Sequence, residues 1–111
     1  MTKEQLRSYQ TLKKEYRQIE QRLRAIESRP KSEEEILQPL REFYTEKLNE
    51  LVMAQLSIEK AIETLKPVER DLIRYRYIDG YPWHIVAVKL SYSEQQTHRI
   101  HSCTLQKLKR I

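Results

Sequence analysis

The sequence predicts an all-α protein, with an N-terminal helical hairpin followed by a C-terminal tri-helical helix-turn-helix. Three observations support this fold class. Charged residues make up 33% of the chain, Gly80 is its only glycine, and apolar residues recur at steps of three and four over long stretches. That recurrence is the pattern of amphipathic helices, whereas β-structure needs many turns and β-branched runs.

The first predicted helix covers residues 3 to 28. Its apolar residues recur at helical spacing and share one face: Leu6, Tyr9, Leu12, Tyr16, Ile19, Leu23 and Ile26. Arg29, Pro30 and Lys31 then interrupt the pattern, because proline cannot continue a helix.

The second predicted helix begins with a capping box formed by Ser32 and Glu35. Pro39 permits two interpretations: the helix kinks there, or a short turn ends and the main helix begins. We favour the second, with a main helix over about 39–65. Its apolar stripe consists of Ile36, Leu37, Leu40, Tyr44, Leu48, Leu51, Ile58, Ile62 and Leu65.

Two striped helices joined by a short loop predict an antiparallel hairpin over residues 1–65. Residues 1–31 carry a net charge of +5 and residues 32–65 carry −5, which favours pairing within one chain or between two, as in a coiled coil. A hairpin alone buries little apolar surface. We therefore expect it to form a homodimer or to pack on the C-terminal unit. Four aromatic residues are expected in the helix seam: Tyr9, Tyr16, Phe43 and Tyr44.

Residues 66–111 are predicted to form three helices. The first begins at Pro67, which suits a first helical turn, and stops at Gly80. The second covers about 82–90, and the third follows Ser93, its expected N-cap. A short helix, a three-residue turn and a longer helix are typical of a helix-turn-helix.

The third helix separates apolar and polar positions. Its expected inward face consists of Thr97, Ile100, Thr104, Leu105 and Leu108. Glutamine can pair with adenine, arginine with guanine or phosphate, and glutamate with cytosine. The candidate contacts to double-stranded DNA are therefore polar residues of this helix and its cap: Ser93, Glu94, Gln95, Gln96, His98, Arg99, Ser102 and Lys107. A net charge of +5 over residues 66–111 suits a polyanion.

Several other classes of protein are disfavoured. Cys103 is the only cysteine, so no intrachain disulfide and no cysteine-built zinc site is available. His98 and His101 are three residues apart, but no third metal ligand lies nearby, and no Gly-rich phosphate loop or catalytic motif is present. We expect no metal, no cofactor and no enzymatic activity. The absence of a long apolar run and of a signal peptide predicts a cytoplasmic protein without a membrane contact.

The C-terminal stretch resembles region four of bacterial sigma factors. The resemblance is carried by Leu65, Pro67, Glu69, Arg70, Asp71, Leu72, Ile73, Arg76, Tyr77, Gly80, Val86, Ala87, Leu90, Ser93, Ile100, Thr104, Leu105 and Leu108. It implies that Glu94, Gln95, His98 and Arg99 face base edges, and that RNA polymerase is a potential partner.

A narrower resemblance rests on three phrases, GYPWHIV, LSYSEQQTHRIH and LQKLK. They are similar to small phage-encoded regulators of the RinA/ArpU type, which implies control of late or lytic phage genes. Two alternatives stay open from the sequence. One is a small terminase-like DNA-packaging subunit, and the other is a module that docks on RNA polymerase without reading DNA.

Overall fold

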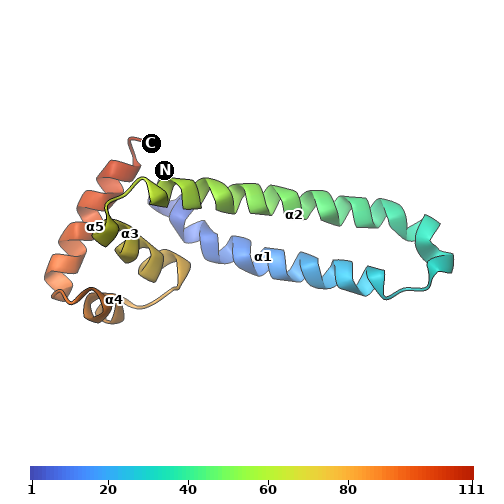
Figure 1. Ribbon diagram of the computed structural model, residues 1–111, viewed down its shortest axis with the longest axis horizontal. Coiled ribbons are helices and arrows are strands. Elements are labelled where there is room, and N and C mark those ends of the chain that lie inside the picture. The colour runs from blue at the N-terminus through green and yellow to red at the C-terminus, as the bar shows by residue number, and fades with distance from the viewer. The chain divides into compact units, whose positions relative to one another are not determined.

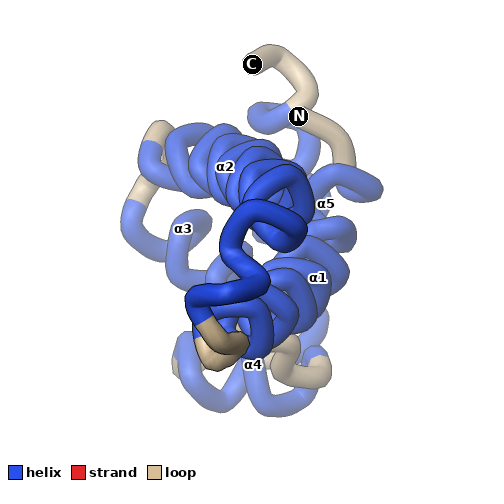
Figure 2. Tube along the Cα trace, turned by 90° about the vertical axis from the view of Figure 1, so that its right-hand side faces the viewer, coloured by secondary structure: helices blue, strands red, loops and turns tan.

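The computed structural model describes all 111 residues and contains helices and no strands. Figures 1 and 2 show that short loops connect these helices. The elements are α1 (Lys3–Glu27), the 3₁₀ turn η1 (Lys31–Glu33), α2 (Glu34–Glu63), α3 (Pro67–Ile73), the π-helical segment η2 (Arg74–Ile78), α4 (Trp83–Leu90) and α5 (Glu94–Leu108). The predicted all-α class, with a helical hairpin followed by a tri-helical segment, is confirmed.

The chain divides into two compact units, which we call the composite unit and the hairpin unit. The composite unit joins Met1–Gln10 to Leu56–Ile111, and the hairpin unit comprises Thr11–Gln55. These units differ from the division at residues 65 and 66 that the sequence suggested. The reason is that the start of α1 and the end of α2 place apolar side chains in the same core as α3 to α5. A functional division at that point stays a prediction.

In the hairpin unit, the α1 and α2 segments run antiparallel (Figure 1). Ile26 and Leu51 are buried, and Tyr16 and Tyr44 are half-buried. Phe43, expected in the seam, is 60% exposed, and Ile36 and Leu40 of the predicted stripe are exposed as well. These three predictions of burial are wrong for the single chain. The apolar stripe of α2 is wider than the surface that α1 alone can cover.

The start of α2 also differs from the prediction. The helix begins at Glu34 and passes through Pro39, whereas we expected the main helix to begin at about residue 39. Pro39 lies in the second turn, so its missing N–H removes a single backbone hydrogen bond near the end of the helix. The expected capping box of Ser32 and Glu35 is absent. A 3₁₀ turn replaces it, closed by the hydrogen bond from Glu33 N to Pro30 O at 3.0 Å.

The core of the composite unit draws on all five helices. Its fully buried side chains are Leu6, Ile62, Leu72, Ile73, Val86, Thr97, Thr104 and Leu108. The six aliphatic side chains among them, completely removed from water, each contribute about 1.5 to 3 kcal/mol. This core fixes α4 and α5 relative to α3. None of the helices combines the length and apolarity that crossing a bilayer demands.

A polar network reinforces the same core at its edge. The Arg74 guanidinium donates to Glu59 Oε2 at 2.8 Å and to Glu63 Oε1 at 2.6 Å. The Tyr9 hydroxyl donates to Glu59 Oε1 at 3.0 Å. Because these groups come from α1, α2 and η2, the network ties three elements of the composite unit together.

Candidate nucleic-acid interface

Gly80 ends the first helical stretch of the C-terminal segment, as predicted. Its φ of +77° lies in the left-handed region, which glycine adopts without the penalty of a Cβ. The last turn is wider than an α-helix: Asp79 N donates to Arg74 O at 2.8 Å, and Tyr81 N donates to Tyr75 O at 2.9 Å. The sequence predicted the stop but not the π-helical segment before it.

The turn between α4 and α5 has the geometry of a helix-turn-helix. Pro82 precedes α4 with an extended backbone and gives no side-chain cap. Ser91 ends α4 in the left-handed region at a φ of 62°, and Tyr92 N donates to Ala87 O at 3.1 Å. Ala87 is buried, and its small side chain lets the neighbouring backbone approach closely.

Ser93 caps α5, as predicted. Gln96 N donates to Ser93 Oγ at 3.1 Å, and Ser93 N donates to Gln96 Oε1 at 3.2 Å, which together form a capping box. The cap satisfies two backbone donors and fixes the direction in which α5 begins. Gln96 therefore has a structural role here, and its expected contact with DNA stays a prediction.

The inward face of α5 agrees with the sequence pattern. Thr97, Thr104 and Leu108 are fully buried, whereas Ile100 and Leu105 are partly exposed. Both buried hydroxyls are satisfied within the helix, because Thr97 Oγ1 donates to Ser93 O at 2.8 Å and Thr104 Oγ1 donates to Ile100 O at 2.7 Å. Two threonines are thus accommodated in the core without unpaired polar atoms.

Glu69 of α3 anchors the C-terminal half of α5. Its carboxylate accepts from Lys66 N at 3.2 Å and lies 2.7 Å from the Lys107 ammonium. Burial alone would raise the pKa of Glu69, but the Lys107 ammonium and the Lys66 N–H outweigh burial, so the pKa is lowered. Lys107, a candidate phosphate contact, is therefore held in an intramolecular ion pair in this structure.

The outward face of α5 carries the remaining candidate DNA contacts. All of its predicted polar residues are exposed: Glu94, Gln95, His98, Arg99 and Ser102. None of them forms an ion pair with another residue. The N-terminal half of a capped helix thus presents free donors and acceptors to solvent, which is the arrangement that base reading in the major groove requires.

His101 is buried in the core, a position that the sequence pattern did not predict. It is 7% exposed, and its Nε2 lies 2.6 Å from the Tyr77 hydroxyl. Burial, followed by the charges of Lys3, His98, Arg76 and Arg7, lowers the pKa of His101 to about 4. The ring is therefore neutral at pH 7, and the tautomer of the ring sets the direction of its hydrogen bond with the Tyr77 hydroxyl. The helical spacing from Thr97 to Thr104 could have revealed this inward position.

Trp83 connects that core to the exposed face. Its ring centroid lies 4.5 Å from the ring of buried His101 and 4.6 Å from the ring of exposed His98. The start of α4 therefore supports the side of α5 that faces solvent. Trp83 therefore anchors the packing of α4 against α5.

A tri-helical core, a left-handed turn and a capped second helix with an exposed polar face define a helix-turn-helix of the DNA-binding class. Residues 61–110 match the family model described as Sigma-70, region 4. A region-4-type helix-turn-helix is thus present over just under half of the chain, and domains of this type bind DNA in transcription and associate with RNA polymerase. The chain matches no curated protein and no solved structure.

Proposed function

We propose that this protein is a sequence-specific DNA-binding transcriptional regulator and not an enzyme. The observation that carries the proposal is the row of unpaired polar side chains on the outward face of α5, beginning at the Ser93 cap. The match to Sigma-70, region 4 supports the same function, because it covers both helices of the helix-turn-helix.

In the proposed complex, α5 enters the major groove and its first two turns contact base edges. Gln95 is suited to adenine and Arg99 to guanine, because each offers a bidentate pair of hydrogen-bonding groups. Glu94 accepts from cytosine N4, and His98 is held against Trp83 at 4.6 Å, which limits its rotation. Lysine and arginine contacts to phosphates set the register and the salt dependence.

The similarity to RinA/ArpU-type regulators extends the proposal to the control of late or lytic genes of a phage or prophage, in the cytoplasm of the host.

The proposed regulator is a homodimer that forms through the N-terminal helices. Exposed Ile36, Leu40 and Phe43 are four and three residues apart on α2, so they form one apolar ridge that a second chain would cover. A solution mass of two chains is expected. A ring of eight or more chains would instead favour the packaging subunit.

The decisive variant is Gln95→Ala combined with Arg99→Ala. Each lost base contact is worth about 1 to 3 kcal/mol, so the pair should lower the affinity for the selected site by at least tenfold and leave nonspecific binding largely intact. Arg17→Ala with Gln18→Ala, which removes the same residue types from an exposed part of α1, is the matched control. An unchanged affinity in the Gln95 and Arg99 variant would contradict the proposal.

A second candidate function, docking on RNA polymerase, is favoured by an apolar groove of about 580 Å³ between α3 and α5. Val68, Tyr92, Ile100 and Cys103 are among the residues that line it. Co-purification with polymerase in DNA-free buffer, lost on Val68→Asp, would support this function. Arg99 also lines this groove, so polymerase docking and DNA reading would share this residue, whereas Gln95 and His98 lie outside the groove.

A further inference from the structure

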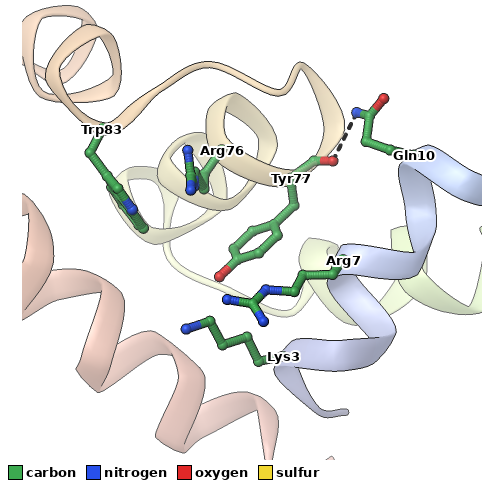
Figure 3. Close-up of a pocket in the computed structure, with 6 residues that line it drawn as sticks. All are labelled: Lys3, Arg7, Gln10, Arg76, Tyr77 and Trp83. Atoms are coloured by element: carbon green, nitrogen blue, oxygen red, sulfur yellow. Dashed lines mark hydrogen bonds between the residues drawn. The ribbon is translucent and has the colours of Figure 1, made fainter.

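Three cations gather around one small pocket of the composite unit. The pocket has a volume of about 170 Å³ and is lined by Lys3, Arg7 and Gln10 of α1, by Arg76 and Tyr77 of η2, and by Trp83 of α4. Figure 3 shows the Arg7 guanidinium and the Lys3 side chain close to the Tyr77 hydroxyl, with Arg76 beside Trp83. Two of these elements belong to the region-4 match, but α1 does not.

The three cations of this pocket have no acidic partner within ion-pair distance. None of the eight ion pairs of the structure includes Lys3, Arg7 or Arg76. Arg76 donates to Tyr81 O at 3.0 Å, and its guanidinium carbon lies 4.7 Å from the centre of the Trp83 ring. Neither partner is an anion, so neither contact neutralises the guanidinium. Burial is the largest cause of the lowered pKa of His101, and the charges of Lys3, Arg76 and Arg7 lower it further.

The walls of the pocket are fixed by the fold. The Gln10 amide donates to Tyr77 O at 3.0 Å and also to Ile78 O, which ties α1 to the end of η2 (Figure 3). Tyr77 is held from the other side by its hydrogen bond with His101. Arg7 and Lys3 are therefore carried by a helix that is anchored to the opposite wall.

We propose that this pocket binds a phosphate group. Three cations in one concave site favour a multiply charged oxyanion over a single carboxylate, and guanidinium groups match the geometry of phosphate oxygens. Sites for whole drug-sized ligands occupy about 300 to 1,000 Å³, so a pocket of about 170 Å³ encloses a phosphate with a few waters and leaves the rest of the ligand outside. The phosphate comes either from the DNA backbone or from a small soluble phosphate compound.

The test uses Trp83, the only tryptophan of the chain, as a reporter inside the pocket. The full-length protein is titrated with inorganic phosphate, with chloride at matched ionic strength as reference, and in a second arm with duplex DNA. Saturable phosphate binding with a dissociation constant of about 1 mM or tighter would identify a soluble ligand source. A response to DNA alone identifies the backbone as the source only if the Lys3 and Arg7 variant weakens it, because Trp83 also lies 4.6 Å from His98 of the proposed reading face.

The variant Lys3→Gln with Arg7→Gln removes two cations that make no ion pair, so the fold should persist, which circular dichroism checks. It should abolish the phosphate response or, in the DNA arm, lower the salt slope of log Kobs by about 0.9 for one lost phosphate. Lys14→Gln with Arg17→Gln, exposed positions of the same helix, is the matched control. An unchanged response in the Lys3 and Arg7 variant, or no response of the wild type in either arm, would overturn the proposal.

The proposal for this pocket and the proposal for the DNA-reading face can be contradicted independently of each other. Gln95 and Arg99 lie outside the pocket, so Gln95→Ala with Arg99→Ala should keep the response to inorganic phosphate while it loses sequence-specific binding. If the protein binds no DNA, the titration with inorganic phosphate alone tests whether the pocket binds a phosphate group.

Discussion

Arg74 and Arg76 lie two residues apart on η2 and have opposite environments. Arg74 is enclosed by the carboxylates of Glu59 and Glu63, at 2.8 and 2.6 Å. Arg76 has no acidic partner and shares a pocket with Lys3 and Arg7. The first cluster balances its charge within the chain, and the second leaves three positive charges for something outside it.

This difference shows why the net charge of a segment is a weak guide to its function. Residues 66–111 carry +5, but Arg70, Arg74 and Lys107 are all held in intramolecular ion pairs. The unpaired cations of the pocket include Lys3 and Arg7, which lie in another part of the sequence. Only the fold reveals which charges are already neutralised.

The largest predicted effect concerns His101, which lies beside the unpaired cluster. Its pKa is about 4 in the folded chain and 6.5 in the unfolded one. The neutral His101 ring therefore contributes its full stabilisation above pH 6.5, and this contribution is lost as the pH falls towards 4. The reason is that, in this pH range, the unfolded chain binds a proton at His101 that the folded chain does not bind. The loss in free energy of unfolding reaches at most about 3 kcal/mol.

Urea denaturation at a series of pH values would measure this effect. His101→Gln keeps an acceptor for Tyr77 but cannot titrate, so the stability difference between it and the wild type should shrink as the pH falls from 6.5 to 4. His84→Gln, at an exposed position of α4 outside this cluster, is the control and should retain the pH dependence of the wild type. A constant difference between the wild type and His101→Gln would refute the assignment of a buried neutral ring.

The next largest effect separates the two arginines directly. Arg74→Gln leaves Glu59 and Glu63 without their partner and should lower the free energy of unfolding by about 1 to 2 kcal/mol, because these half-exposed pairs are partly screened by solvent. Arg76→Gln loses a contact with Trp83 and should cost less than about 1 kcal/mol, while phosphate binding weakens. Thermal melts of the two variants check the comparison. Equal losses of stability in the two variants would contradict the distinction between the ion-paired cluster of Arg74 and the unpaired cluster of Arg76.

A smaller effect is expected at the turn that follows both arginines. Gly80 has a φ of +77°, and a Cβ there would meet only Gln10 Nε2 at 3.8 Å, which is ordinary contact. Gly80→Ala should therefore cost about 1 kcal/mol through backbone strain alone. Gly80→Asn, which tolerates this conformation better, should recover part of the loss. An alanine variant as stable as the wild type would show that the turn relaxes.

The smallest effect is expected at the exposed ion pair of Arg41 and Glu34 in the hairpin unit. This pair lowers the pKa of Glu34 through its hydrogen bond with Arg41, but both groups are surrounded by solvent. Arg41→Gln should leave the melting temperature unchanged within error. A clear drop in the melting temperature would mean that exposed ion pairs stabilise this protein more than the comparison of Arg74 with Arg76 assumes.

Local patterns in the sequence predicted most of the fold. Helical spacing placed Leu6, Ile62 and Leu108 in the core, and Gly80 and Ser93 marked the helix ends that the structure shows. The pattern failed at the start of α2, where a 3₁₀ turn and a continuous helix through Pro39 replace the expected cap. One lost hydrogen bond near a helix end is too small a penalty to dictate the boundary.

The candidate site was predictable in part. The outward direction of Gln95, His98 and Arg99 followed from the spacing of α5 and is confirmed by their exposure. The pocket was not predictable, because Lys3 and Arg76 are 73 positions apart and meet only through tertiary packing. The buried role of His101 was hidden because histidine is common on surfaces as well as in cores.

The central claim is that the outward face of α5 reads a DNA sequence. Selection from a random pool of double-stranded DNA, with binding of the enriched sequence repeated at two salt concentrations, tests it most directly. We predict one enriched motif, with two half-sites about 10 base pairs apart if the hairpins dimerise, and an affinity that falls as salt rises. A pool that stays random, with only weak and salt-sensitive binding, would contradict the claim.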